Sequence, residues 1–174
     1  MRRGESLNRY RNLSTVVSHV KAVRVIVRAV KMGNPAARSD LMRVRILVVD
    51  DHYLAREMIK TTLRFCRCAE PEIVGVAEDG ATGIEMAWQL MPDVVTMDIS
   101  LPDINGLEVT RRLTEGTPPF KVVVVTMHGG RKYKEAALKA GANHFIDKMY
   151  LIDELPKYLD GLAGKSAVCD AADG

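Results

Sequence analysis

Residues 93–109 read Asp-Val-Val-Thr-Met-Asp-Ile-Ser-Leu-Pro-Asp-Ile-Asn-Gly-Leu-Glu-Val, and this stretch decides the fold. An apolar run, Val94–Met97, stops at the carboxylate of Asp98, and a proline and an Asn-Gly pair stand ahead of a helical pattern. The pattern predicts a buried strand, a loop and a helix. Because ligands bind outside the carboxyl ends of strands in open parallel sheets, Asp98 is a candidate for chemistry. The alternative is that Asp98 only caps the turn that follows.

The same unit of strand, loop and helix recurs on both sides of this stretch. Alternation of strands and helices with short loops predicts a parallel sheet that is covered by helices on both faces. The predicted fold class is therefore α/β, and a flavodoxin-like (βα)5 sandwich with strand order 2-1-3-4-5 suits five strands. The four further strands are predicted at 44–49, 73–77, 122–125 and 143–146.

The last helical pattern runs from Leu151 to Leu162 and contains a proline, Pro156. Proline is tolerated in the first turn of a helix, because the N–H group that it lacks has no partner there. We therefore expect the helix to begin near Asp153, with that carboxylate as its N-cap.

Charge divides the chain into a basic arm and a mildly acidic body. Residues 1–43 carry ten Lys/Arg and two acids, hence +8, whereas residues 44–174 carry fifteen and twenty, hence −5. We expect 1–43 to be a basic N-terminal extension that is loosely structured or partly helical, 44–162 to be the folded domain and 163–174 to be a C-terminal tail. Valines at helical spacing in the arm leave open a helix for a membrane surface or an acidic partner.

The cysteines and the hydropathy bear on the compartment. Three cysteines without a Cys-x-x-Cys pair argue against a disulfide framework and against a zinc site, so we expect unpaired thiols. A reducing, cytoplasmic location fits that expectation. The chain has no run of 18 apolar residues, so we expect no membrane span.

Charged and hydroxyl side chains follow four of the predicted strands at one edge of the sheet. Asp50 and Asp51 follow the first strand and Asp98 follows the third. Such a cluster of carboxylates favours a cation, and hard oxygen ligands suit Mg²⁺. Thr126 ends the fourth strand and Lys148 follows the fifth.

Together these groups predict a phosphoryl-transfer site. Asp98 can act as the nucleophile, while the cation and Lys148 neutralise charge on the transferred oxygens. The alternatives are a calcium or structural metal site, or acidic strand ends that are salt-bridged to Lys148.

Four segments of the chain resemble one known family, the response-regulator receiver domains of two-component signalling. The resemblance covers about 44–162 and is closest to receivers that precede LuxR-type helix-turn-helix domains. The segments are Ile-Leu-Val-Val-Asp-Asp-His (46–52), Met-Asp-Ile-Ser-Leu-Pro-Asp-Ile-Asn-Gly-Leu-Glu (97–108), Val-Val-Val-Thr-Met-His (123–128) and Ala-Leu-Lys-Ala-Gly-Ala-Asn-His-Phe-Ile-Asp-Lys (137–148).

The resemblance implies a Mg²⁺-dependent phosphoacceptor. Asp98 would accept a phosphoryl group from a histidine kinase or a phosphotransfer protein. Asp51, Asp98 and the backbone carbonyl of Ser100 would bind the metal directly, and Asp50 mainly through water.

The resemblance also implies a switch. Thr126 and Lys148 would hold the phosphoryl oxygens, and Thr126 would move inward and let Phe145 become buried. The surface that changes would be the Arg131–Leu162 face, where a downstream protein partner would bind. Met149 stands where many receivers have a proline.

We therefore interpret the chain as a stand-alone receiver that switches partner binding or relays phosphate, without direct nucleic-acid contact. The alternative is the receiver part of a transcription regulator whose DNA-binding domain is missing or supplied in trans. We expect no enzyme activity beyond self-phosphorylation and self-dephosphorylation, since a phosphohydrolase would need a second catalytic carboxylate and a substrate cap. A flavin-binding fold would need a Ser/Thr/Gly-rich loop in place of Asp-Asp-His-Tyr at 50–53.

Overall fold

The computed structural model of the protein describes residues 41–164, so most of the predicted arm and tail lies outside the described residues. Within this range, five strands alternate with helices and no helix is long and apolar enough to cross a membrane. The strands are β1 (Met42–Val49), β2 (Ala69–Ala77), β3 (Val94–Met97), β4 (Lys121–Thr126) and β5 (His144–Asp147). The helices are α2 (Tyr53–Thr62), α3 (Gly80–Leu90), α4 (Gly106–Thr114), α5 (Arg131–Lys139) and α6 (Leu151–Ala163), with 3-10 turns η2 (Leu63–Phe65) and η3 (Lys148–Tyr150).

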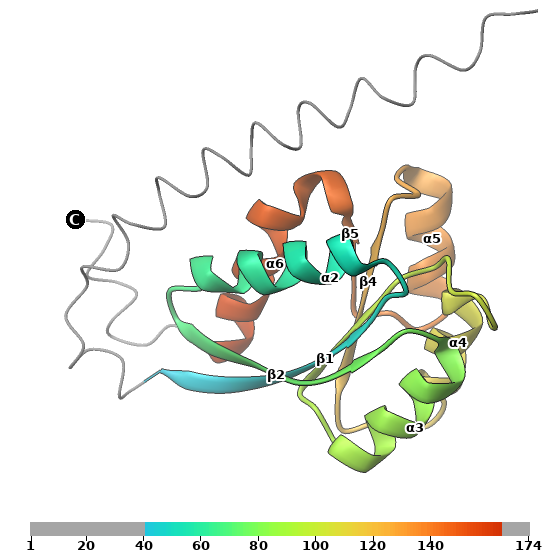
Figure 1. Ribbon diagram of the computed structural model, residues 1–174, viewed down its shortest axis with the longest axis horizontal. Coiled ribbons are helices and arrows are strands. Elements are labelled where there is room, and N and C mark those ends of the chain that lie inside the picture. The colour runs from blue at the N-terminus through green and yellow to red at the C-terminus, as the bar shows by residue number, and fades with distance from the viewer. Residues whose placement is uncertain (1–40, 165–174) are drawn as a thin grey trace, which may run out of the picture. The chain divides into compact units, whose positions relative to one another are not determined.

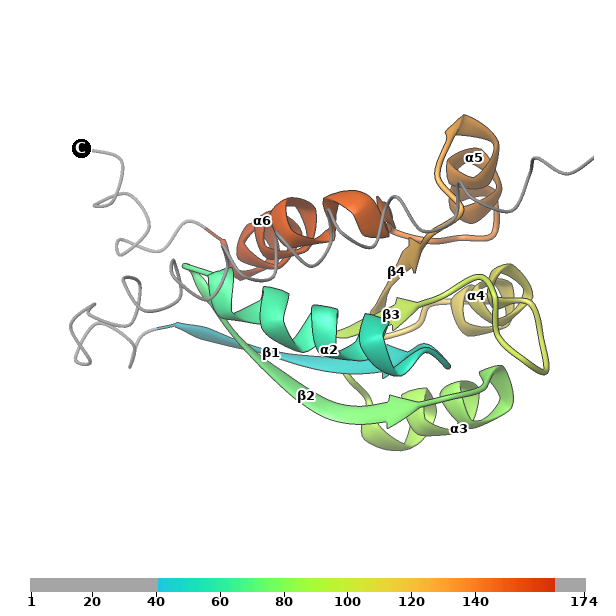
Figure 2. The same cartoon turned by 45° about the horizontal axis from the view of Figure 1, so that its top comes forward.

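The five strands form one parallel sheet in the order β2-β1-β3-β4-β5, which confirms the predicted flavodoxin-like topology. Alternate side chains of β1 point to opposite faces. Ile46 and Val48 pack in the core beneath α2 and α6, whereas Leu47 and Val49 pack in the core beneath α3 and α4. Figures 1 and 2 show α2 and α6 on one side of the strands and α3 on the other. Burial on both faces explains why the strands read as continuous apolar runs.

The first two strands begin earlier than the apolar pattern predicted. Their pairing starts at Met42 and Ala69, where Arg43 lies 3.8 Å from Glu70 across the two strands. The carboxylate of Asp160 in α6 also accepts hydrogen bonds from the backbone N–H groups of residues 67, 68 and 69, at 2.8–3.0 Å. Backbone pairing and this carboxylate therefore extend the strands into polar sequence.

The prediction for the start of α6 was wrong. The helix begins at Leu151, so Asp153 lies inside its first turn and Pro156 lies inside the helix. The turn η3 leads directly into α6, and the Asp147 carboxylate accepts a hydrogen bond from the N–H of Met149 at 2.9 Å. Pro156 is itself buried in α6, next to Leu155, which is fully buried. The free energy gained by burying apolar side chains along the helix thus exceeds the cost of the backbone hydrogen bond that the proline cannot make.

The prediction of unpaired thiols was wrong for Cys68, which is disulfide-bonded. Cys66 is a free thiol, and burial raises its pKa to about 12. An odd number of cysteines leaves one thiol over but does not prevent a single bond.

Candidate functional site

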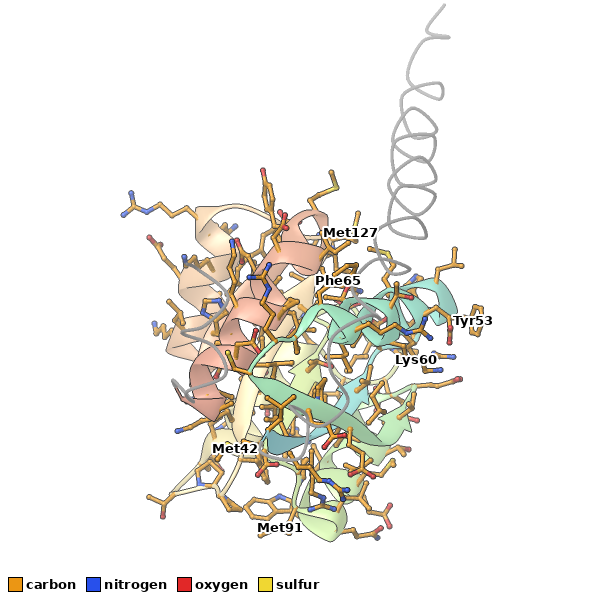
Figure 3. All side chains as sticks on the ribbon, turned by 90° about the vertical axis from the view of Figure 1, so that its left-hand side faces the viewer. Met42, Tyr53, Lys60, Phe65, Met91 and Met127 are labelled. Carbon is orange, nitrogen blue, oxygen red and sulfur yellow. The ribbon has the colours of Figure 1, made fainter. Side chains whose placement is uncertain are left out.

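The predicted site residues lie where the central strands end. The N–H of Asp50 donates to the carbonyl oxygen of Ala77 at 3.0 Å, and the N–H of Asp98 donates to that of Val49 at 2.9 Å. The hydrogen-bond ladder of the sheet therefore continues one residue past β1 and β3 and carries both carboxylates to the same edge. Asp50 and Asp98 are buried, at 1% and 4% exposure. In Figure 3, Met127, just past the end of β4, is well separated from Met42 at the start of β1.

Lys148 joins the two buried carboxylates. Its Nζ lies 2.7 Å from Oδ2 of Asp50 and 3.1 Å from Oδ2 of Asp98, and the lysine side chain is itself buried. Oδ1 of Asp98 accepts a hydrogen bond from the N–H of Ile99 at 2.8 Å. With Asp51 included, the cluster holds three carboxyl groups and the one ammonium group of Lys148.

The environment of Asp50 opposes its ionisation. Burial raises the pKa of this carboxyl above its ordinary value of 3.8, and the negative charge of Asp98 raises it further. The contact with Lys148 and a hydrogen bond from the backbone N–H of His52, at 3.0 Å, act in the opposite direction without cancelling the effect of burial. An additional positive charge at this place would relieve the carboxylates.

The donor atoms fit a divalent cation. Carboxylate oxygens of Asp50, Asp51 and Asp98 and a ring nitrogen of His52 all lie within 4.8 Å of one another. Three carboxylates on rigid strand ends suit a hard ion such as Mg²⁺, which keeps several waters of its own. Ser100 follows Asp98 by two positions, in the loop between β3 and α4.

Thr126 and Phe145 are both buried beside this edge. The hydroxyl oxygen of Thr126 accepts a hydrogen bond from the N–H of His128 at 3.2 Å, so the hydroxyl hydrogen remains able to bind an anion. Phe145 is only 7% exposed and packs in a cluster with Val124 and Ala137. Little further apolar burial is therefore available to Phe145, and burial alone cannot drive the switch that the sequence implied.

Two further side chains near the site, Arg56 and His52, escaped the sequence analysis. The Arg56 guanidinium donates to the carbonyl oxygens of Asp50 and Asp51 at 2.9 and 3.0 Å, and it lies 2.7 Å from Glu78. Nδ1 of His52 lies 2.6 Å from Oδ1 of Asp51. The available signal was the position of Arg56, one helical turn after His52, on the first turn of α2 beside an acidic pair.

The Asn-Gly pair at 105–106 shapes the loop beside Asp98. The Asn105 side chain caps α4 by accepting the N–H of Leu107 at 2.9 Å, and the N–H of Gly106 donates to the carbonyl oxygen of Ile99 at 2.8 Å. A Cβ atom at Gly106 would collide with the backbone carbonyl of Asp98. Glycine is thus required at 106 because two backbone segments touch there.

The comparison with known proteins decides the family. Residues 46–160 match the sequence model of the response regulator receiver domain, which covers the second half of β1, the other four strands and every predicted site residue. The chain belongs to the response regulator receiver domain family. It is thus a receiver of the two-component signalling systems, and phosphorylation by a kinase is general in this family.

Relatives of the receiver carry various further parts. Transcriptional regulatory protein DegU of Brevibacillus brevis is 37% identical over 115 residues, which are 65% of this chain and 47% of that protein. A protein-glutamate methylesterase/protein-glutamine glutaminase of Koribacter versatilis is 40% identical over 108 residues, 60% of this chain and 29% of that enzyme. A LuxR-family two-component response regulator from Aurantimonas sp. SI85-9A1 superposes with a TM-score of 0.62 at 26% identity, over 75% of this chain and 94% of that chain. The receiver therefore spans about half or less of the length of these curated relatives.

Proposed function

We propose that this receiver accepts a phosphoryl group on Asp98 from a phosphohistidine of a histidine kinase or a phosphotransfer protein. The observation that carries the proposal is the ammonium of Lys148 shared between two buried carboxylates, Asp50 and Asp98, at the carboxyl edge of a parallel sheet. A buried carboxylate that already contacts a cation is prepared for the extra negative charge that phosphorylation brings.

The transfer is a displacement at phosphorus. A carboxylate oxygen of Asp98 attacks, the new P–O bond forms, the P–N bond to the donor imidazole breaks, and the imidazole leaves with the bonding electrons and takes up a proton. Lys148 stays close to the reacting carboxylate and compensates its charge. The buried hydroxyl of Thr126 donates to a phosphoryl oxygen after the transfer.

Asp51, Asp98 and the backbone carbonyl of Ser100 would hold Mg²⁺, with Asp50 acting mainly through water. The ion, when bound, supplies positive charge to the phosphoryl oxygens. The cluster of carboxylate oxygens within 4.8 Å supports this assignment, because it contains more negative charge than Lys148 alone can balance.

A protein, rather than a small molecule alone, is the natural donor for this site. Exposed apolar side chains follow three of the strand ends that carry the pocket, and Figure 3 shows Tyr53 projecting from α2. Such side chains at a polar pocket are typical of a protein contact. They are Tyr53 and Leu54 after β1, Met127 after β4, and Met149 and Tyr150 after β5.

For the output, we propose that phosphorylation alters the Arg131–Leu162 face, which then binds a downstream protein, or that the phosphate is relayed onward. We expect the action to take place in the cytoplasm, where kinases find ATP, without enzyme activity on other substrates and without direct nucleic-acid contact by residues 41–164. A second candidate is the receiver part of a transcription regulator, with the DNA-binding part elsewhere. The match to about half of DegU favours that candidate.

Phosphotransfer profiling tests the proposal. Purified, radiolabelled histidine kinases are each mixed with the receiver and Mg²⁺, and we expect rapid transfer from one or a few of them. Asp98→Asn should abolish the transfer, and Glu57→Gln, a change in an exposed surface ion pair of α2, should leave it intact. Transfer to Asp98→Asn at the parent rate would overturn the proposal.

A further inference from the structure

One side chain links the loop beside Asp98 to helix α5. Nε2 of His128 is hydrogen-bonded to Oγ of Ser100 at 2.9 Å, across the gap between the β3–α4 loop and the β4–α5 loop. On its other side, the His128 ring stacks on the ring of Tyr133, with 5.1 Å between centroids and 26° between planes. Tyr133 is the third residue of α5.

The backbone of the same residue is tied to Thr126. The N–H of His128 donates to Oγ1 of Thr126 at 3.2 Å, and Thr126 is completely buried. A displacement of the Thr126 hydroxyl therefore changes a hydrogen bond of His128 directly. His128 thus contacts the candidate phosphate-binding hydroxyl, the loop that follows Asp98, and the first turn of α5.

Two glycines follow His128 in this loop. Gly130 has a φ of 101°, a conformation that glycine adopts readily, and it precedes α5 directly. Gly129 lies so close to the carboxylate of Asp147 that a Cβ atom would not fit. Gly129 therefore packs tightly against Asp147, and the His128 side chain ties the same loop to Ser100 and to Tyr133.

We propose that His128 is a positioning residue that couples the state of Asp98 to α5 through the bridge Ser100–His128–Tyr133. This inference rests on the proposed phosphorylation of Asp98. A phosphoryl group changes the positions of Ser100 and Thr126, both of which His128 contacts, and the stacked ring carries the displacement to Tyr133.

The experiment compares amide hydrogen exchange across 131–139 with and without beryllofluoride and Mg²⁺, in the full chain. ¹⁹F NMR verifies that beryllofluoride occupies the site in each variant. His128→Phe keeps an aromatic ring but removes the hydrogen bond to Ser100, and Ser100→Ala removes the same bond from the other side. In both variants we expect the ratio of exchange rates between the two states to shrink by about threefold or more. The double variant should show no larger loss than either single variant, because one bond is removed in all three.

His144→Phe is the matched control. His144 stacks on Tyr158 with 4.9 Å between centroids, at the interface of β5 and α6, and takes no part in the bridge. The same substitution there should leave the α5 response intact. An unchanged α5 response in both His128→Phe and Ser100→Ala, with the site occupied, would overturn the coupling and leave the proposed function standing. Failure of the parent receiver to bind beryllofluoride would overturn the proposed function, and this inference with it.

Discussion

Lys148 lies closer to Asp50 than to the proposed phosphoacceptor. Its Nζ is 2.7 Å from Oδ2 of Asp50 and 3.1 Å from Oδ2 of Asp98. In the unphosphorylated receiver, the lysine therefore serves mainly to balance a carboxylate whose own pKa burial has raised. The carboxyl groups of this site are more crowded than burial favours. A bound cation would reduce the repulsion between them.

Asp50→Asn should stabilise the metal-free fold and weaken the response to Mg²⁺. A carboxyl with a raised pKa binds its proton more tightly in the folded than in the unfolded state, so it lowers stability as pH rises from about its ordinary value of 3.8 through its raised folded value. Urea unfolding in EDTA, followed over this range and up to pH 7, should show a smaller loss of stability with rising pH in Asp50→Asn than in the parent. Equal slopes for both proteins would contradict this reading of Asp50.

Mg²⁺ should raise the thermal midpoint of the receiver by mass action. At a free concentration of about ten times Kd, the gain in unfolding free energy is about 1.4 kcal/mol. Asp51→Asn should remove most of the gain, because Asp51 belongs to the carboxylate cluster, whereas Glu57→Gln on the exposed face of α2 should keep it. A midpoint of the parent that does not respond to Mg²⁺ would show that the cluster holds no such ion.

Gly106→Ala should damage both the fold and the site. The added methyl group would collide with the backbone carbonyl of Asp98, and overpacking of this kind costs about 1–3 kcal/mol of unfolding free energy. Gly161→Ala in α6 is the matched control, since within residues 41–164 its Cβ position meets nothing within 4 Å beyond its own helix backbone, and alanine favours the helix by about 0.5–1 kcal/mol. Urea titration followed by the fluorescence of Trp88, the single tryptophan, measures both effects. A neutral Gly106→Ala would mean that the loop beside Asp98 moves freely.

Thr126→Ala should separate phosphorylation from output. The Thr126 hydroxyl is buried, and its hydrogen bond is to the N–H of His128 rather than to Asp98. Asp98 should therefore still accept phosphate in this variant, at reduced efficiency. Loss of the phosphoryl-binding hydroxyl should abolish the change in amide exchange across 131–162 on addition of beryllofluoride. Full retention of that change would assign the switch to other residues.

The carboxyl ends of the strands could be predicted well from the sequence, and their starts less well. Val94–Met97 appeared as β3 with the predicted bounds, because a strand buried on both faces is apolar throughout and ends at its first charge. The β2 start was missed by four residues, since pairing at Ala69 depends on the Asp160 carboxylate, 91 residues away in the chain. Local periodicity carries no information about such a distant partner.

The site was predictable in its acids and its lysine, and less so in its supporting groups. Parallel strands bring their carboxyl ends together whatever the side chains, so residue type at each end sufficed for Asp50, Asp98 and Lys148. Arg56 binds backbone carbonyl oxygens, which every residue carries, so its position on the first turn of α2 after the acidic pair was the one available signal. The burial of Phe145 likewise depends on side-chain rotamers, which cannot be predicted from the spacing of residues in the sequence.

The most direct test of the account is to locate the phosphoryl group chemically. The receiver is incubated with acetyl phosphate and Mg²⁺, treated with borohydride, which reduces an aspartyl phosphate to homoserine, and analysed by peptide mass spectrometry. We predict that reduction occurs at position 98, that EDTA prevents it, and that Asp50 and Asp51 in the same pocket remain unmodified. Reduction at Asp50 or Asp51 instead, or none at position 98 while Mg²⁺ is present, would contradict the assignment of Asp98 as the phosphoacceptor.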